Sequence, residues 1–395
     1  MHNKQAQDQP PTDAAATRHL AAMHRLLLEE AEYQHGEIPF DRYMELALYA
    51  PGLGYYVNRS RKFGQDGDFI TAPETSPLFS QCLARQCRQV LDTIGGGDIL
   101  EFGAGSGVMA ADLLAELQRL DCLPEHYLLL ELSAELRQRQ HETLQQKIPG
   151  LMGRVHWLDR LPEGGFRGVV LGNELLDAMP VHRFRIDESG LQEQFVAVSE
   201  AGIEASWRAA ISPGLTDAVS AIQADVGPLL VGYESEVNLR LGPWVRAVAE
   251  QLAQGVILLI DYGYSRREYY HPERGQGTLI CHYRHRAHGD AFVLPGLQDI
   301  TANVDFTAVA EAGVESGLEL AGFTTQAHFL AASGLDELMM ASDPNQMRDH
   351  LQLVQGVKTL TLPSEMGERF KVIALSRGVD EPLRGFAMRD LRDRL

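Results

Sequence analysis

Cysteine, long apolar segments and basic charge are all scarce in this sequence of 395 residues, and each scarcity excludes a class of protein. The four cysteines include no CxxC pair, so neither a disulfide scaffold nor a zinc ribbon is indicated. The apolar run from Val256 to Ile260 ends at Asp261, far short of the roughly 18 residues that a membrane span needs. We therefore expect a protein of a reducing compartment that does not insert into a membrane.

The charge balance is strongly acidic, because 35 basic residues face 54 acidic ones and leave a formal net charge of −19. Such a surface repels phosphate backbones, so we expect a cationic partner and no nucleic acid. The first residues have neither the apolar core of a secretory signal nor the arginine content of an organelle transit peptide. We interpret residues 1–16 as a disordered tail and expect a cytoplasmic location.

Residues 17–95 have the pattern of a helical and loop-rich extension. Apolar residues recur at helical spacing from Thr17 to about Gln34, and a second helix is expected from Phe40 to Ala50, before Pro51 and Gly52. Glycines and prolines then indicate ordered loops, and Leu78 to Leu91 is expected to form a third helix.

From residue 96 onward, short apolar runs alternate with helical stretches, which is typical of a parallel sheet covered by helices. We assign 96–182 and 245–395 to this α/β core. The segment 183–244 alternates like a β-hairpin around Glu200-Ala201-Gly202, and we assign it to an inserted, β-containing, substrate-side subdomain. The strands expected in the core are Ile99 to Phe102, His126 to Leu130, Val155 to Leu158, Val169 to Leu171, Val256 to Ile260, Thr324 to Phe329 and Phe370 to Leu375.

The clearest local motif is a buried-type strand, Ile99 to Phe102, that runs directly into Gly103-Ala104-Gly105-Ser106-Gly107 and then a helix. Glycines let the backbone turn tightly and approach a ligand, and the helix start offers unpaired N–H groups. A nucleotide-like cofactor is therefore expected. A dinucleotide fingerprint would need a third glycine at position 108, where the chain has Val108, so a nicotinamide-dependent oxidoreductase is disfavoured.

The form ExGxGxG resembles the first motif of class I S-adenosylmethionine-dependent methyltransferases. That resemblance implies that Glu131, at the end of the next strand, accepts the ribose hydroxyls and that Asp159, at the end of the third, meets the adenine amino group. At the end of the fourth strand stand Asn173, Glu174 and Asp177, where α/β sheets bind ligands.

Nine further segments stand in a fixed order along the chain: IPFDRYMELALYAPGLGYY, GDFITAPETSPLF, LEFGAGSG, LGNELLDAMPVHRF, GYESEVN, LLIDYGY, GTLICHYRHRAHGD, DITANVDF and GFTTQAHFL. Their sequences and order resemble the MidA family, which is related to mitochondrial complex I assembly methyltransferases. This resemblance implies a Rossmann-like, mostly parallel sheet with helices on both faces, S-adenosylmethionine as cofactor, and symmetric dimethylation of an arginine on a respiratory-complex subunit. It also places the segment with Asp68, Thr71 and Glu74 over the cofactor. The cofactor-binding residues so expected are Glu101, Gly103, Ala104, Gly105, Gly107, Glu131, Asp159, Asn173, Thr71 and Glu74.

A guanidinium acceptor also suits the acidic residues, because a permanent planar cation is best held by carboxylates that receive its N–H groups in pairs. We hypothesise that Glu174, Asp177, Glu234 and Glu236 form the acceptor site, with Asp261 nearby. The alternative for the glutamates is that they cap helices or form ion pairs with arginines such as those at 183 and 185.

The segment with His282, His285 and His288 invites a metal interpretation, which we disfavour because arginines crowd the histidines and no carboxylate completes a site. We expect no metal, and place Tyr283, His285 and Arg286 near the pocket. Two alternatives to a protein-arginine methyltransferase stay open: a non-catalytic assembly factor that keeps the cofactor pocket, and a small-molecule methyltransferase.

Overall fold

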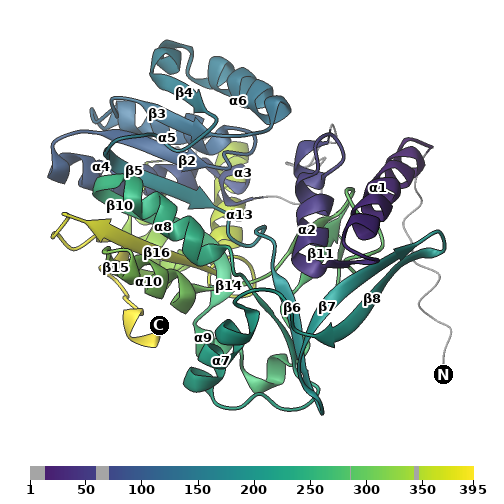
Figure 1. Ribbon diagram of the computed structural model, residues 1–395. Helices are drawn as coiled ribbons and strands as arrows, with labels where there is room; N and C mark the ends of the chain where they lie inside the picture. Colours follow the sequence, from purple (N-terminus) through teal and green to yellow (C-terminus); the bar gives the residue numbers. More distant parts are fainter. Residues whose placement is uncertain (1–13, 59–70, 285, 342–346) are drawn as a thin grey trace.

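A seven-stranded core sheet dominates the computed structural model, which describes residues 14–58, 71–284, 286–341 and 347–395 (Figure 1). Five of the strands are parallel, and β16 runs antiparallel to both of its neighbours. A further short strand, β14 (Val304–Asp305), pairs in parallel with the end of β10. In spatial order the seven are β15 (Glu319–Thr325), β16 (Phe370–Arg377), β10 (Leu252–Tyr264), β5 (Phe166–Asn173), β2 (Asp98–Phe102), β3 (Tyr127–Leu130) and β4 (Val155–Leu158).

Helices cover both faces of this sheet, because its central strands are apolar on both sides. Alternate residues of β2 point to opposite faces, so Ile99 packs with one layer of helices while Leu100 packs with the other. The expected mostly parallel α/β fold is confirmed. The first layer includes α4 (Pro77–Ile94), α5 (Val108–Arg119), α6 (Ala134–Lys147), α11 (Gln326–Ala332) and α12 (Leu335–Met340), and the second includes α8 (Leu241–Gln251) and α10 (Phe306–Glu315).

One expected strand was misplaced. We predicted a strand from Thr324 to Phe329, but β15 ends at Thr325 and α11 begins at Gln326. Thr325 is the N-cap of that helix, and its hydroxyl accepts a hydrogen bond from the backbone N–H of His328. The capping threonine therefore ends the strand in the middle of the apolar run.

A second sheet lies beside the core and is built from the inserted segment and the N-terminal extension (Figure 1). Its strand β7 pairs with β8 in the expected hairpin, with Ser199 opposite Gly202. Helices α1 (Ala14–Tyr33) and α2 (Phe40–Tyr49) pack against this sheet through a shared apolar cluster. The strands are β1 (Glu37–Pro39), β6 (His182–Asp187), β7 (Gly190–Ser199), β8 (Gly202–Ala209) and β9 (Glu234–Val237), and α7 (Leu215–Val226) and α9 (Arg266–Tyr269) lie close by.

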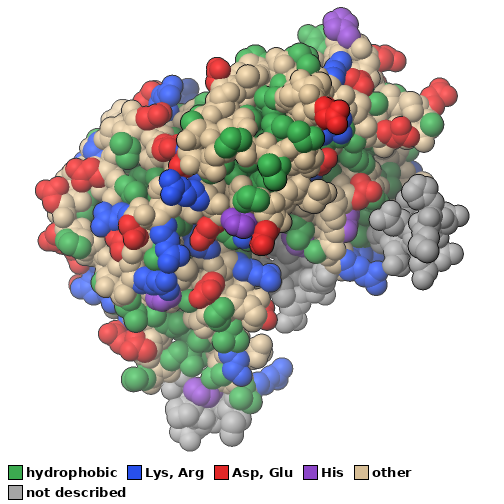
Figure 2. Space-filling model, turned by 90° about the horizontal axis from the view of Figure 1, so that it is seen from below, with side chains coloured by type: hydrophobic (Ala, Val, Ile, Leu, Met, Phe, Trp, Pro, Cys, Tyr) green, Lys and Arg blue, Asp and Glu red, His purple; other side chains and the backbone are tan. Residues whose placement is uncertain are grey.

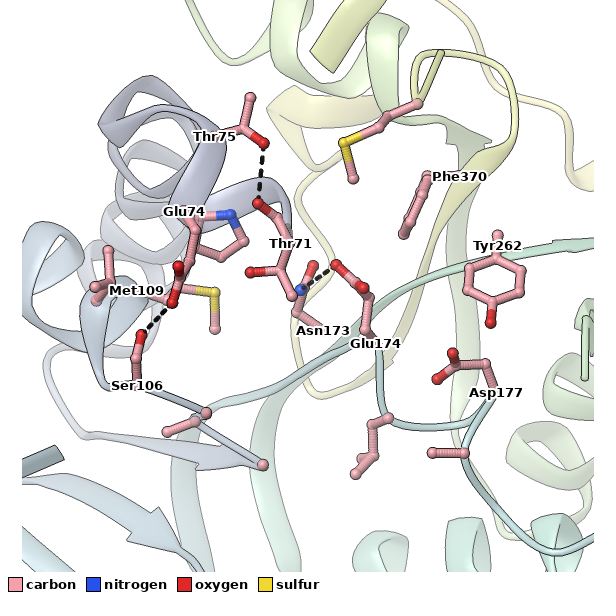
Figure 3. A pocket seen from close by; sticks show the side chains of 18 of the residues that line it. Thr71, Glu74, Thr75, Ser106, Met109, Asn173, Glu174, Asp177, Tyr262 and Phe370 are labelled. Atoms are coloured by element: carbon pink, nitrogen blue, oxygen red, sulfur yellow. Dashed lines mark hydrogen bonds between the residues drawn. The ribbon is translucent and has the colours of Figure 1, made fainter. Parts of the chain in front are cut away.

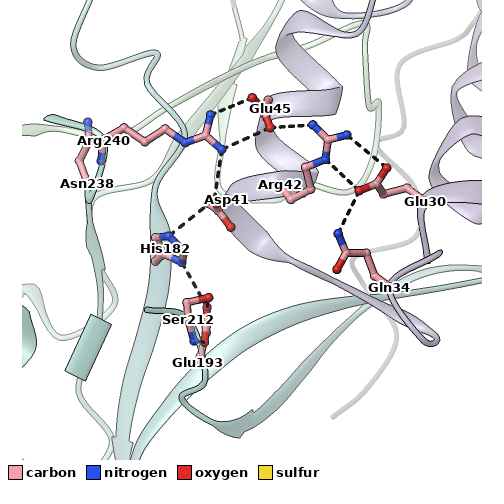
Figure 4. A network of polar contacts seen from close by, with 10 residues as sticks. All are labelled: Glu30, Gln34, Asp41, Arg42, Glu45, His182, Glu193, Ser212, Asn238 and Arg240. Carbon is pink, nitrogen blue, oxygen red and sulfur yellow. Dashed lines mark hydrogen bonds and ion pairs between the residues drawn. The ribbon is translucent and has the colours of Figure 1, made fainter. Parts of the chain in front are cut away.

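A network of ion pairs fastens α2 to the inserted sheet (Figure 4). Arg240 contacts Asp41 at 3.2 Å and Glu45 at 2.9 Å. The ring nitrogens of His182 lie 3.6 Å from Asp41 and 3.1 Å from Glu193. Because these residues come from four separate segments, the network orients the extension against the rest of the protein.

Two further elements border the carboxyl edge of the core sheet. One is a small antiparallel sheet of β12 (Arg286–His288), β11 (Ile280–Tyr283) and β13 (Asp299–Thr301). The other consists of α3 (Ala72–Thr75) and α13 (Met347–Thr361), which contact each other. None of the helices in the described residues is long and apolar enough to cross a membrane. On the face seen in Figure 2, acidic and basic side chains are interspersed.

Candidate active site

A cavity of about 1400 Å³ lies at the carboxyl ends of β2, β5 and β10 (Figure 3). Its floor is the glycine turn after β2 and the polar segment after β5. Its walls come from α2, α3, the small sheet and α13. Sequence reasoning missed the α13 wall, because no motif in residues 347–361 links that helix to the sheet edge.

Three glycines in the turn after β2 adopt left-handed backbone conformations, with φ of 62° at Gly103, 52° at Gly105 and 81° at Gly107. Gly107 is the N-cap of α5, and a Cβ atom there would lie 3.0 Å from the Cα of Gln140. Ala104 and Ser106 line the cavity between them. The turn therefore needs glycine both for its conformation and for the close approach of α6.

Two carboxylates stand beside this turn. Glu101 is buried and accepts a 2.6 Å hydrogen bond from the Tyr127 hydroxyl, while burial raises its pKa to about 7. Glu131 accepts hydrogen bonds from the backbone N–H of Ser133 at 2.9 Å and from Gln140 Nε2 at 3.1 Å. Burial raises the pKa of Glu131, and these two donors oppose that rise.

Gln140 is a buried residue that sequence reasoning missed, since a single glutamine on a helix carries no motif. Its amide nitrogen donates to Glu131 and, at 3.2 Å, to the carbonyl of Gly105. Its oxygen accepts a 2.9 Å hydrogen bond from Trp157 Nε1. Gln140 thus joins the glycine turn to the carboxylate at the end of β3.

The segment before α4 closes the cavity over the glycine turn. Glu74, on α3, accepts a 2.6 Å hydrogen bond from the Ser106 hydroxyl, and Thr71 lines the same wall. The third residue expected in this segment, Asp68, lies outside the described residues.

Asp159 is not brought to the cavity, contrary to the sequence interpretation. Its side chain is 85% exposed and forms a 2.6 Å ion pair with Arg137. Arg137 also donates to the carbonyl oxygens of Glu131 and Leu158, so its guanidinium is held at the strand ends and keeps Asp159 outside.

The segment after β5 carries the acceptor candidates. Glu174 has a positive φ of 50° and receives a hydrogen bond from the Asn173 amide at 3.3 Å. Desolvation and the neighbouring Asp177 carboxylate raise the pKa of Glu174 to about 8. Desolvation also raises the pKa of Asp177 to about 6, and the neighbouring Tyr262 hydroxyl opposes that rise. The positive φ of Glu174 is a strained backbone conformation for a residue other than glycine, and such strain is frequent in functional sites.

Two buried acceptor atoms in this segment, Oδ1 of Asn173 and Oδ1 of Asp177, have no hydrogen-bond partner among the described residues. Such atoms are rare in folded proteins, and here both residues line the cavity. A ligand with N–H or O–H donors would satisfy them.

Asp261 supports the same segment from beneath. Its Oδ2 atom accepts hydrogen bonds from the backbone N–H groups of Leu175, Leu176 and Asp177 at 2.9–3.2 Å. Burial, followed by Asp177 and Glu174, raises the pKa of Asp261. Asp261 does not line the cavity, so it acts on the acceptor segment through these backbone contacts.

Glu234 and Glu236 also lie outside the cavity lining, so our hypothesis that they bind the acceptor is not supported by their placement. Arg183 lies 3.6 Å from Glu234 and 3.4 Å from Glu236, which is the ion-pair alternative considered above. Glu236 additionally accepts a 2.8 Å hydrogen bond from the backbone of Thr278, a residue of the cavity wall.

The histidine-rich segment forms part of the small sheet. His282 lines the cavity, Cys281 pairs with His288 across β11 and β12, and His285 lies outside the described residues. Within the described residues, Asp98, Glu125 and His126 are the group with metal-ligand atoms within 4.8 Å of one another, and they lie at the opposite end of the strands.

The β2 end of the cavity fits the expected cofactor. The glycine turn leaves room for close contact, α5 directs its N-terminus at the cavity, and Glu131 supplies acceptor oxygens for hydroxyl groups. The segment after β5 lines the same cavity as the glycine turn.

Comparisons with known proteins agree with this geometry. The family model described as "Putative S-adenosyl-L-methionine-dependent methyltransferase" matches residues 82–324. A crystal structure from Burkholderia thailandensis bound to S-adenosyl-homocysteine is 45% identical, covers 98% of this chain and 100% of that chain, and has a TM-score of 0.93. A native structure from the same organism, also 45% identical with the same coverage, has a TM-score of 0.90.

Curated relatives give a further comparison. The Drosophila melanogaster protein arginine methyltransferase NDUFAF7 homolog, mitochondrial, is 30% identical over 87% of this chain and 82% of its own length. The Homo sapiens protein arginine methyltransferase NDUFAF7, mitochondrial, is 28% identical over 86% and 80%. Our expectation of a cytoplasmic location is wrong by this comparison, because these relatives are named mitochondrial proteins.

The family model covers more than half of the chain, and the relatives align along most of it. The resemblance to the MidA family is therefore confirmed. The chain belongs to this family of S-adenosyl-L-methionine-dependent methyltransferases, and S-adenosyl-L-methionine is its cofactor.

Proposed function

We propose that this methyltransferase methylates the guanidinium group of an arginine in a protein substrate. The observation that carries the proposal is the pair of carboxylates, Glu174 and Asp177, that line the cavity next to the cofactor end. Both have raised pKa values, so a cation that enters the cavity gains from their charge and relieves their mutual repulsion.

The cofactor supplies an electrophilic methyl group when bound. A guanidinium nitrogen forms the new N–C bond while the S–C bond of the sulfonium breaks, and one N–H proton is lost, so the products are S-adenosylhomocysteine, a methylated guanidinium and a proton. Glu174, which lines the cavity and is ionised beside a bound cation, is placed to accept that proton before it reaches solvent. Asp177, whose backbone N–H is held by Asp261, is suited to orient the planar group.

The names of the relatives support arginine as acceptor, since they are protein arginine methyltransferases. From the MidA resemblance we extend the proposal to a symmetrically dimethylated product and to a respiratory-complex subunit as substrate. We also assign the acceptor-side surface to residues 17–95 and 183–244, beside a catalytic core of 96–182 and 245–395.

Methyl transfer to arginine is tested with S-adenosylmethionine labelled in its methyl group and an extract of the source cells. Labelled proteins are hydrolysed, and the labelled amino acid is identified by chromatography. We expect labelled methylarginine with the wild-type enzyme. Label in a small molecule or in another amino acid would contradict the proposal, and no transfer at all would favour the non-catalytic assembly factor.

A pair of matched variants assigns the carboxylate. Glu174→Gln removes the charge inside the cavity, and we expect a loss of about 10²–10³-fold in rate with S-adenosylhomocysteine affinity unchanged. Glu234→Gln makes the same change outside the cavity lining and should stay within a few-fold of wild type. Equal effects of the two substitutions would contradict the role given to Glu174.

A further inference from the structure

A third carboxylate, Asp299 on β13, lines the same cavity as Glu174 and Asp177. It lies more than 120 residues further along the chain, and the backbone N–H of Ala302 donates a 3.0 Å hydrogen bond to the carbonyl of Asp177. That bond joins the end of β13 to the acceptor segment. Asp299 is only 3% exposed, so its side chain is shielded from bulk solvent.

Two tyrosines from the N-terminal extension lie beside these carboxylates, and we call the part of the cavity that they share the acceptor compartment. The Tyr56 hydroxyl donates a 2.9 Å hydrogen bond to Asp299 Oδ1, and the Tyr49 hydroxyl donates one of 2.9 Å to the carbonyl of Ala178. Their rings stack with centroids 5.5 Å apart and planes 22° apart, and both residues line the cavity. The extension is therefore bonded to both segments that carry the carboxylates.

Electrostatics places these groups around one space. Burial, then Asp299 and then Asp177, raise the pKa values of both Tyr49 and Tyr56. Asp299 also contributes to the raised pKa of Glu174. The hydrogen bonds from Tyr56 to Asp299 and from Ala302 to Asp177 join the same groups directly.

We propose that Asp299, held by Tyr56, is the residue that makes the acceptor compartment specific for a guanidinium over an ammonium group. This inference rests on the proposed function and names the determinant of its substrate class. A guanidinium presents five N–H donors in one plane, so it can bond to carboxylates along two of its edges, and its flat faces suit aromatic rings. An ammonium group is a compact point charge that gains less from a second carboxylate and from stacked rings.

The test uses the full chain saturated with S-adenosylhomocysteine and two cationic probes that differ only in the side chain: Nα-acetyl-arginine methylamide and Nα-acetyl-lysine methylamide. Calorimetric titration gives the affinity of each. We expect the wild type to bind the arginine probe at least about tenfold more tightly than the lysine probe. Asp299→Asn should lower the affinity for the arginine probe about 10- to 100-fold and the affinity for the lysine probe much less. The affinity for S-adenosylhomocysteine should be unchanged.

Two more variants separate a specific effect from a structural one. Asp290→Asn neutralises an exposed carboxylate in the loop before β13 and should bind both probes as the wild type does. Tyr56→Phe removes only the hydroxyl that donates to Asp299, and it should lower the affinity for the arginine probe about 3- to 10-fold. This variant tests the proposal independently if Asp299→Asn does not fold.

The outcomes are distinguishable. If the wild type shows no preference for the arginine probe, the proposed arginine acceptor itself fails. If the wild type prefers arginine but Asp299→Asn and Tyr56→Phe keep the same preference, the role of Asp299 is refuted and the proposed function stands.

Discussion

Replacing Gln140 by leucine should weaken cofactor binding through Glu131, although Gln140 does not line the cavity. Gln140 is fully buried, and the substitution removes three hydrogen bonds: to Glu131, to the Gly105 carbonyl and from Trp157 Nε1. A net value of about 0.5–1.5 kcal/mol for each bond predicts a loss of about 2–4 kcal/mol in the free energy of unfolding.

The cofactor effect follows from the loss of one donor to Glu131. Burial already raises the pKa of this carboxylate, and Gln140 is one of the groups that lower it, so the pKa rises further in the variant. The ionised carboxylate is the better acceptor for two hydroxyl groups. We therefore expect S-adenosylhomocysteine to bind about tenfold more weakly, with the deficit growing as the pH falls from 8 to 6.

The measurement is calorimetric titration with S-adenosylhomocysteine at several pH values, together with urea unfolding. Gln138→Leu is the matched control, because Gln138 lies on the same helix, is exposed and donates its side-chain hydrogen bond to Glu142 in the next turn. The control should keep wild-type affinity. If Gln140→Leu loses stability but binds S-adenosylhomocysteine within twofold of wild type at all pH values, the link from Gln140 to the cofactor is refuted.

Three other outcomes are expected. Gly107→Ala should lower the free energy of unfolding by about 1–2 kcal/mol, because Gly107 has a φ of 81°. It should also weaken the binding of S-adenosylhomocysteine, because the added methyl group would displace Gln140. Thermal unfolding and calorimetric titration measure the two effects, and unchanged binding would contradict the second. The pKa values of Glu174 and Asp177 are raised to about 8 and 6, so the stability of the ligand-free protein should fall as the pH rises from 5 to 8. Over the same range the affinity for an arginine peptide should rise, because both carboxylates become ionised. Stability and affinity that change in the same direction would contradict this prediction. Glu193→Gln should lower the free energy of unfolding by about 2–4 kcal/mol, because the buried Glu193 carboxylate receives four hydrogen bonds or ion-pair contacts and its pKa is lowered. Calorimetric titration should find the affinity for the cofactor unchanged.

The cofactor half of the protein was largely predictable from the sequence. The strand before Gly103 and the helix after Gly107 are local features, set by hydrophobic periodicity and by backbone conformations that only glycine adopts readily. The carboxyl ends of parallel strands meet at one edge, so Glu131 and Asn173 could be expected at the same cavity.

The acceptor half was decided by tertiary structure. Glu174, Glu234 and Asp299 are all acidic residues near strand ends, and nothing local distinguishes them. Pairing of β6 with β9 places Glu234 beside Arg183, whereas the bond from Ala302 to Asp177 brings Asp299 to the cavity.

Side-chain charge and helical or strand periodicity are properties of a short segment, and the sequence alone determined the fold class, the glycine turn and the cofactor. Which carboxylate meets a ligand depends on contacts between segments more than 100 residues apart, as for Tyr56 and Asp299. Such contacts form only when the extension, the insertion and the core sheet pack together, because local sequence patterns do not specify which distant surfaces pack against each other.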